Sequence, residues 1–234
     1  MISVFVMVYN EEKILQFFID HYRKRFPGCL IDVYDNESTD STAKIARDND
    51  CVVRPYYTAG QVNDDILRGH KNNVWRNAET DWVLVCDADE LLDIDECALK
   101  KEAAAGTTAI VGTAYDMVNL VDSFDYASIK HGIRNSGYDK LMLFDKSHVS
   151  SVDYEYGAHR SHPKGNVRRN ATEYLMLHYY FIDVEYAVQK RRYTDARMSK
   201  LNRVYGLGCQ YLVPDSVVRD KFVWARTTAA QVLP

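Results

Sequence analysis

The chain has 234 residues, of which 47% are hydrophobic and 26% are charged, and its formal net charge is −4. These values are ordinary for a globular protein, so the chain can bury a full core and is not a disordered segment. An acidic chain has no overall basic field that would hold nucleic acid, and we expect no nucleic-acid partner.

The first element is an apolar stretch at residues 2–8. It is too short to cross a bilayer and no basic segment precedes it, so we expect no transmembrane segment, no signal peptide and a cytoplasmic location. The five cysteines form no CxxC pair. This pattern argues against a disulfide scaffold or a zinc site and fits a reducing compartment.

The first half of the chain alternates between expected strands and helices. Residues 2–8 read as a buried strand, and Asn10 is expected to open a helix that Pro27 ends. A strand at 30–34, a helix near 41–49, a strand at 51–54, a helix at 61–78 and a strand at 82–86 are expected next. This alternation is typical of an α/β fold with a mostly parallel central sheet flanked by helices.

The second half is less regular. We expect strands at 108–115, 140–145 and 174–180 and helices at 183–203 and 214–230. No repeat, low-complexity tract or linker divides the sequence, so a single domain over residues 1–234 is the simpler interpretation.

Three carboxylates, Asp87, Asp89 and Glu90, directly follow the strand at 82–86. Ligands bind at the carboxyl ends of strands in open α/β sheets, and crowded acids need a cation or hydrogen bonds to offset their repulsion. Their oxygen atoms suit Mg²⁺ or Mn²⁺, which can bridge a diphosphate. A solvated acidic turn is the plain alternative.

Polar loops also follow the first two strands, at Tyr9–Glu12 and at Asp35–Asp40. If the strands are parallel, both loops lie on the same sheet edge as Asp87. Tyr9 would then lie against a base, and Asp35 would accept a hydrogen bond from uracil. The alternative is that residues of these loops only cap helices.

These three segments together resemble the family 2 glycosyltransferases and related enzymes with the GT-A fold, which carry a DxD motif. The resemblance implies one GT-A, Rossmann-like domain with a nucleotide-binding half at 1–92 and an acceptor half at 93–234 that includes the C-terminal helices. It also implies a metal-dependent transferase that moves a sugar from a nucleotide-sugar donor, a UDP-sugar in our expectation, to a hydroxyl of a glycan or other acceptor, with inversion.

The resemblance also suggests roles for single residues. Asp89 would bind Mn²⁺ or Mg²⁺ directly, Asp87 would contact the metal or the ribose, and His178 would complete the metal site. His159 is the second choice of histidine and His162 the third. The expected nucleotide-binding residues are Tyr9, Asn10, Glu12, Asp35, Lys71 and Asp87.

Two of these assignments have competing interpretations. Lys71 would offer its ammonium to the diphosphate, but an exposed helix face explains it equally well. A lone histidine within an apolar run such as that around His178 is more often a core residue. For the basic cluster at 190–197, a solvated helix is the default interpretation, although one arginine there could reach a phosphate.

The catalytic base is the least defined part of the site. An inverting transferase needs a carboxylate to take the proton of the acceptor hydroxyl. The sequence lacks the Glu-Asp pair that many GT-A enzymes carry, and the candidates are Asp153 and Asp116, with Glu155 behind them.

Other classes of protein remain to be weighed. A catalytically inactive protein of the same fold that binds a carbohydrate or a nucleotide sugar is the alternative that stays open. A sugar-1-phosphate nucleotidyltransferase would need a glycine-rich loop after the first strand, which this chain lacks. A haloacid-type phosphatase would need Thr where Leu91 stands.

Overall fold

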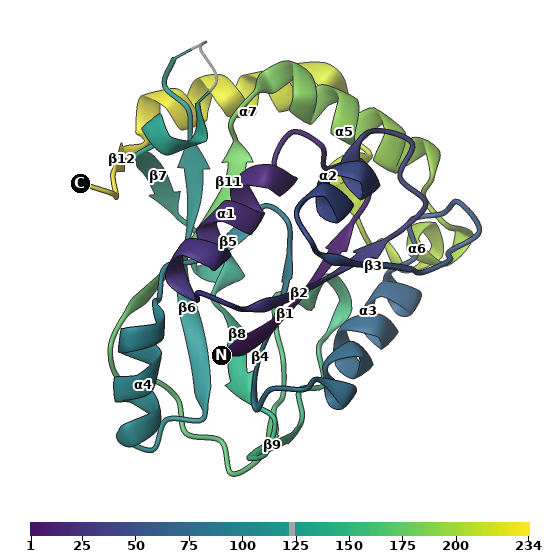
Figure 1. Ribbon diagram of the computed structural model, residues 1–234. Coiled ribbons are helices and arrows are strands. Elements are labelled where there is room, and N and C mark those ends of the chain that lie inside the picture. The colour runs from purple at the N-terminus through teal and green to yellow at the C-terminus, as the bar shows by residue number, and fades with distance from the viewer. Residues whose placement is uncertain (122–124) are drawn as a thin grey trace.

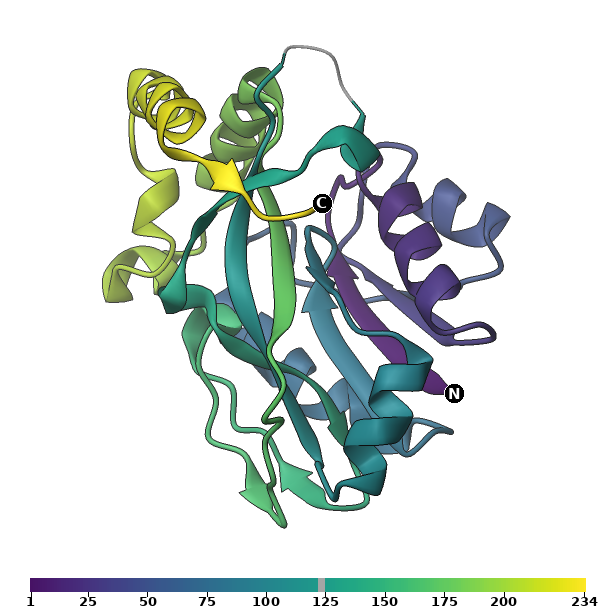
Figure 2. The same cartoon turned by 90° about the vertical axis from the view of Figure 1, so that its left-hand side faces the viewer.

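The apolar stretches of the sequence form the strands of one large central sheet with helices on both sides (Figures 1 and 2). The computed structural model describes residues 1–121 and 125–234. The strands are β1 (Ile2–Val8), β2 (Leu30–Asp35), β3 (Val52–Pro55), β4 (Trp82–Asp87), β5 (Glu90–Leu92), β6 (Ala109–Val118), β7 (His131–Arg134), β8 (Lys140–Asp145), β9 (Val149–Ser151), β10 (Lys164–Gly165), β11 (Tyr174–Phe181) and β12 (Ala230–Gln231). The α-helices are α1 (Leu15–Arg25), α2 (Thr42–Asp48), α3 (Asp64–Asn73), α4 (Glu96–Ala104), α5 (Val184–Ala196), α6 (Lys200–Tyr205) and α7 (Asp215–Thr228).

The sheet joins a parallel part to an antiparallel part. Its order is β12-β7-β6-β8-β4-β1-β2-β3, and β11 pairs with both β5 and β6. Strands β4, β1, β2 and β3 run parallel, as the alternation of strands and helices predicts. Beyond β4, strands β8 and β7 join antiparallel, so the sheet as a whole is mixed. The predicted α/β class with a helix-flanked central sheet is confirmed.

Strand β1 lies in the middle of the sheet and is buried along its whole length. Ile2, Val4 and Val6 belong to the core on one face, where α1 and α2 pack. Phe5 and Met7 belong to a second core on the other face, together with residues of α3. Side chains alternate between the faces of a strand, so burial on both faces explains the unbroken apolar sequence of β1.

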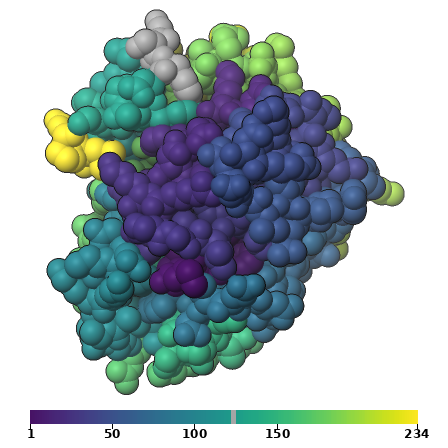
Figure 3. Space-filling view, in the orientation of Figure 1, coloured from purple at the N-terminus to yellow at the C-terminus, as the bar shows by residue number. Residues whose placement is uncertain are grey.

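The C-terminal helices form a third core of their own. Val188 of α5 and Phe222 of α7 pack with Phe181 of β11. These helices lie on the side of the sheet opposite α1 and α2 (Figure 2). In the space-filling view, the first quarter of the chain, in purple and blue, covers the centre of the face toward the viewer (Figure 3).

The start of α1 corrects one expectation from the sequence. Asn10 does not open this helix, which begins at Leu15. Asn10 has a positive φ of 54°, and its backbone N–H donates to the Ser38 hydroxyl. The loops after β1 and β2 thus bind each other, and this bond holds Asn10 outside the helical conformation.

The helix expected at 183–203 is also wrong, because α5 and α6 are separate. Between them, the Arg197 carbonyl accepts a hydrogen bond of 2.8 Å from the Val62 N–H, and the Ser199 N–H donates to the Val62 carbonyl at 3.1 Å. Ser199 then caps α6. Pairing with the loop after β3 therefore diverts the backbone from the helix.

Among residues 1–121 and 125–234, no helix is long and apolar enough to cross a membrane. All five cysteines are free thiols in this structure.

Candidate functional site

The carboxyl ends of β1, β2 and β4 meet at one edge of the sheet. Val8 lies beside Asp35 in the β1–β2 register, and Met7 lies beside Asp87 in the β1–β4 register. The three polar segments of the sequence therefore lie together, as their positions at strand ends predict. A cavity of about 630 Å³ opens there.

The side chains of Asn10, Glu12 and Asp35 accept hydrogen bonds within the loops after β1 and β2. The Thr39 N–H donates to the Asn10 side-chain oxygen at 2.8 Å, and the Ser41 N–H donates to the Glu12 carboxylate at 2.9 Å. Asp35 accepts a hydrogen bond from the Ser38 N–H. None of the three lies in the cavity wall. Their contacts stabilise the two loops against each other.

Tyr9 does line the cavity, at the end occupied by Arg197. The Arg197 guanidinium carbon lies 3.3 Å from the centre of the Tyr9 ring. Arg197 also donates to the Asn36 side-chain oxygen at 2.7 Å. A cation over an aromatic face is attracted by the ring quadrupole, so this contact fixes Arg197 over the loop after β1.

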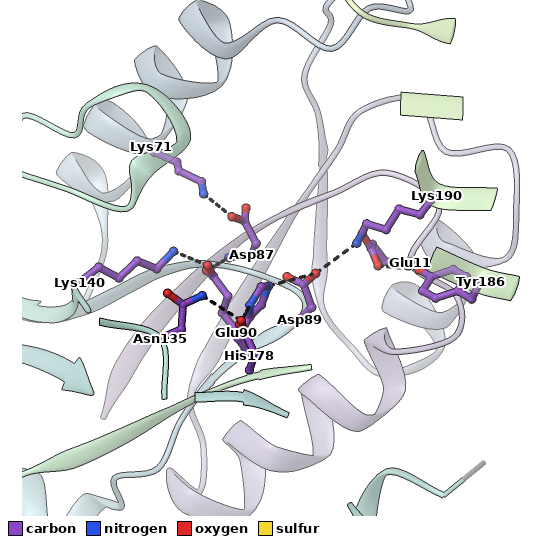
Figure 4. Close-up of polar contacts among 11 residues, drawn as sticks. Glu11, Lys71, Asp87, Asp89, Glu90, Asn135, Lys140, His178, Tyr186 and Lys190 are labelled. Carbon is purple, nitrogen blue, oxygen red and sulfur yellow. Dashed lines mark hydrogen bonds and ion pairs between the residues drawn. The ribbon is translucent and has the colours of Figure 1, made fainter. Parts of the chain in front are cut away.

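Asp87 and Glu90 each face a buried lysine (Figure 4). The Lys71 ammonium lies 2.7 Å from Asp87, and Lys140 forms an ion pair with Glu90. Burial alone would raise the pKa of Asp87, but Lys71 and Lys140 hold it below its ordinary value. Lys71 therefore lies at the acidic motif, in an ion pair with a residue expected to bind the nucleotide or the metal.

Asp89 faces the C-terminal half of the molecule. Lys190 of α5 places its ammonium 3.2 Å from Asp89 and 2.7 Å from Glu11 (Figure 4). Burial would raise the pKa of Asp89, yet Lys190 and then His178 lower it well below its usual range. Asp89 is therefore ionised at neutral pH.

His178 lies between two carboxylates. Its Nδ1 lies 2.6 Å from Asp116, and its Nε2 lies 3.9 Å from Asp89. Asn135 donates to the second oxygen of Asp116 at 2.8 Å. Burial lowers the pKa of His178, but Asp116 and Asp89 outweigh it, so the net shift is upward. The bond to Asp116 turns Nε2 toward Asp89.

His159 also lines the cavity but differs from His178 in its surroundings. The centre of its ring lies 3.9 Å from that of the Tyr138 ring, which also stacks with the His178 ring. Burial and the nearby Lys140 lower the pKa of His159 to about 4, so its imidazole is neutral at pH 7. Its Nδ1 lacks a hydrogen-bond partner among the described residues.

Asp153, Glu155 and His162 lie outside the cavity wall. Asp153 forms a surface ion pair of 2.7 Å with Lys164, and Glu155 pairs with His162. The structure thus places Asp116, but not Asp153, beside His178 and near Asp89.

Comparison with known proteins identifies the family. The sequence model of the family "Glycosyl transferase family 2" matches residues 3–160. The chain belongs to glycosyl transferase family 2. The curated protein RfbJ of Shigella flexneri is 32% identical to this family 2 chain over 92 residues, which cover 39% of the chain and 67% of RfbJ.

Two solved structures show a weaker likeness. S. aureus TarS is 17% identical, with a TM-score of 0.43, over 62% of this chain and 28% of TarS. Glucosyl-3-phosphoglycerate synthase of Mycobacterium tuberculosis, crystallised with Mn²⁺, UDP and glucosyl-3-phosphoglycerate, is 18% identical, with a TM-score of 0.36, over 49% of this chain and 44% of the synthase. The family 2 chain thus spans less than half of each of these two proteins.

The acidic centre of this family 2 protein, formed by Glu11, Asp87, Asp89, Glu90 and Asp116, has together with His178 oxygen and nitrogen donors that suit a divalent cation. No three His, Cys, Asp or Glu side chains within the described ranges form a ready metal cage. Asp89 and His178 nevertheless direct an oxygen and a nitrogen toward each other, and Asp116 orients the histidine as outer partners of metal ligands do. Mg²⁺ typically keeps several waters and binds one or two carboxylates plus phosphate oxygens, so an incomplete protein cage matches this chemistry.

The charges at this centre support the same fit. Five carboxylates gather there, and three lysines form ion pairs with four of them. A histidine that binds a metal ion must be neutral, and with a neutral His178 two negative charges would remain, which is the charge that one divalent cation offsets. The carboxylates are Glu11, Asp87, Asp89, Glu90 and Asp116, and the lysines are Lys71, Lys140 and Lys190.

Glu11, Lys140 and Lys190 of the family 2 chain were not among the site residues predicted from the sequence. One signal was available for Lys190, because Tyr186, Lys190 and Tyr193 recur at helical spacing and form one polar face of α5. Each of these three side chains lines the cavity. Reading the basic cluster as a solvated helix was wrong for Lys190, whose ammonium is paired with two carboxylates.

Proposed function

We propose that this family 2 protein transfers a sugar from a nucleotide-sugar donor, a UDP-sugar, to an acceptor hydroxyl with inversion at the anomeric carbon. The observation that carries the proposal is the pairing of Asp89 with His178 at the end of β4, inside a cavity that reaches Tyr9. Family membership supplies the reaction class, and this arrangement supplies a place for the donor.

The nucleoside would lie at the Tyr9 end of the cavity. Tyr9 offers an aromatic face there, and Arg197 with Asn36 supplies hydrogen-bonding groups. Arg197 covers the Tyr9 ring, so a base that binds against this ring requires Arg197 to move aside or to stack on the base. A hydrogen bond from the Val62 N–H to the Arg197 carbonyl holds the backbone of Arg197 in place.

The diphosphate would lie between Asp87, Asp89 and the lysines around them. Asp89 and His178 would hold Mn²⁺ or Mg²⁺, which when bound offsets the negative charge that develops on the departing diphosphate. Lys71 keeps Asp87 ionised and fixed, because its ammonium is buried against this carboxylate. The chain thus provides cations and carboxylates in a fixed arrangement, which lowers the reorganisation needed during reaction.

Asp116 is the candidate that we retain as catalytic base. Of the two expected bases, only Asp116 lines the cavity. Its carboxylate would take the proton of the acceptor hydroxyl while its bond to His178 keeps both groups oriented. Asp153 is paired with Lys164 outside the cavity, and we do not propose it further.

Calorimetric titration tests this proposal directly. We would titrate UDP, GDP and dTDP into the protein in Mn²⁺ and again in EDTA. UDP is expected to bind in Mn²⁺ and to bind far more weakly in EDTA. Absence of binding by all three nucleotides under both conditions would remove the proposal. Binding without hydrolysis or transfer of the matching sugar nucleotide would indicate an inactive binding protein of the same family.

A further inference from the structure

Lys190 differs from the other two lysines of the acidic centre. The side chains of Lys71 and Lys140 are 2% and 1% exposed, and each pairs with one carboxylate. The Lys190 side chain is 25% exposed and pairs with two carboxylates, Glu11 and Asp89. Of these three lysines, Lys190 is therefore the one whose side chain is partly exposed and can leave one carboxylate while it stays paired with another.

The contact of Lys190 with Asp89 involves the oxygen that faces His178. Lys190 lies 3.2 Å from Oδ2 of Asp89, and His178 Nε2 lies 3.9 Å from the same oxygen. A divalent cation held by Asp89 and His178 would meet an ammonium group only a few ångströms away. Like charges at such distances repel strongly at the effective dielectric constant of a protein, so the ammonium group and the cation compete for this oxygen.

Glu11 offers Lys190 a place to remain. Its carboxylate lies on the loop after β1, and Tyr186 donates a hydrogen bond of 2.9 Å to its second oxygen. The Glu11 carboxylate is thus held in position from α5 whether or not Lys190 also contacts Asp89. A lysine can pivot on its four-carbon stem, so the ammonium can leave Asp89 while it keeps Glu11 as its counter-charge.

We propose that Lys190 is an internal counter-ion that occupies Asp89 when no divalent cation is bound, and that it keeps Glu11 but turns from Asp89 to the donor diphosphate when cation and donor bind together. The diphosphate part of this inference rests on the proposed function. The competition between Lys190 and a metal ion for Asp89 does not, because it follows from the distances at this oxygen.

The substitution Lys190→Met tests the competition with Mn²⁺ alone, without nucleotide. Removing the ammonium frees Asp89 and removes a repelling charge, so Mn²⁺ affinity measured by calorimetry or by electron paramagnetic resonance is expected to rise about tenfold or more. In saturating Mn²⁺ the same variant is expected to bind UDP about tenfold more weakly, because the diphosphate loses a cationic partner. A purely structural lysine would not move these two affinities in opposite directions.

Arg192→Met is the matched control on the same helix. Arg192 pairs with Asp215, and its side chain is 62% exposed. This variant removes a cation from α5 while leaving the acidic centre intact, so both affinities should match those of the native chain.

Loss of Lys190 leaves two carboxylates without their partner, and the variant is expected to melt earlier. Mn²⁺ should then raise its melting temperature by more than it raises that of the native chain, so a destabilised variant still gives an answer. Lys190→Gln, which keeps hydrogen-bond donors toward both carboxylates, provides a second folded variant. Mn²⁺ affinity that is unchanged or lower in both variants would overturn the proposal. A native chain that binds Mn²⁺ but no nucleotide would contradict the proposed function alone.

Discussion

At the acidic motif, each carboxylate faces a lysine from a different part of the chain. Lys71 comes from α3, Lys140 from β8 and Lys190 from α5. An isolated buried charge is costly, and a paired one is much less so. The motif can therefore remain ionised within the molecule because three separate elements supply its counter-charges.

Asp89→Asn tests the central carboxylate. Asparagine keeps the shape of the side chain but loses the charge that would attract a divalent cation, and Lys190 keeps Glu11 as its partner. We expect UDP affinity in Mn²⁺ to fall by more than about tenfold, measured by calorimetry, with the far-ultraviolet circular dichroism unchanged. Asp153→Asn is the matched control, because Asp153 lies outside the cavity, paired with Lys164. Equal affinities of the Asp89 variant and the native chain would show that the site is misplaced.

Asp116→Asn separates two roles of one carboxylate. If Asp116 takes the proton of the acceptor, turnover at saturating donor and acceptor should fall by about 100-fold to 10,000-fold, with a smaller change in Mn²⁺-dependent UDP affinity. The measurement is kcat beside the dissociation constant of UDP. The opposite pattern, with affinity lost and turnover at saturation retained, would assign Asp116 to the orientation of His178 alone, since the His178 ring and the Asp116 carboxylate are hydrogen-bonded at 2.6 Å.

At the scale of the elements, the close approach of β6 and β11 depends on a glycine. A Cβ atom built on Gly112 would lie 2.7 Å from the Cβ of Met176 and 3.1 Å from a methyl group of Leu92. Met176 belongs to β11, which carries His178, and Leu92 belongs to β5, which begins at Glu90. The lack of a side chain at Gly112 thus allows the strand that carries His178 to pack at its observed distance from β6.

Gly112→Ala is expected to destabilise the protein by about 1 to 3 kcal/mol, because an extra methyl group must displace well-packed neighbours. The free energy of unfolding from urea titration measures this change. Gly69→Ala, in α3, is the matched control because no other atom lies within 4 Å of the Cβ it would add. Alanine favours the helix there, so this variant should be as stable as the native chain or more stable by up to about 1 kcal/mol. Equal stability of the two variants would contradict the packing role of Gly112.

For the molecule as a whole, the sequence predicts the parallel part of the sheet better than the rest. Strands buried on both faces give continuous apolar runs, and β1 and β4 follow from them directly. Strands β7 and β12 have four and two residues, too few for a periodic signal. Helix α4, at Glu96–Ala104, was also not predicted. Its sequence signal is Asp95, whose side chain caps the helix by accepting a hydrogen bond from the Ala98 N–H.

The same division holds for the candidate site. Residues that follow buried strands, such as Asp87 and Asp89, can be found because the strand determines where they lie. The position of Lys190 depends instead on how the second half folds over the first. The helical spacing of Tyr186, Lys190 and Tyr193 defines a face of α5 but does not say which surface this face contacts. The division into a nucleotide-binding half and an acceptor half stays a prediction, since one sheet runs through both.

The pH dependence of global stability should reveal one buried histidine away from the cavity wall. His21 is a buried residue of α1, and its side chain donates a hydrogen bond of 2.9 Å to the Leu92 carbonyl of β5. Burial and the nearby Arg25 lower the pKa of His21 from 6.5 to about 4. The unfolded chain therefore takes up a proton at a higher pH than the folded chain. The stability conferred by neutral His21 is complete above pH 6.5 and is lost as the pH falls toward 4, by about 3 kcal/mol in all.

His21→Gln is expected to remove this contribution, because glutamine can still donate to Leu92 but does not titrate. Free energies of unfolding from urea titrations between pH 7.5 and pH 4.5 should fall less steeply with decreasing pH in the variant than in the native chain. The other titrating groups are common to both proteins, so the difference between the two slopes isolates His21. His162→Gln provides the control, since the His162 side chain is 68% exposed and its replacement should leave the slope unchanged. Parallel curves for the native chain and the His21 variant would show that His21 does not resist protonation in the folded protein.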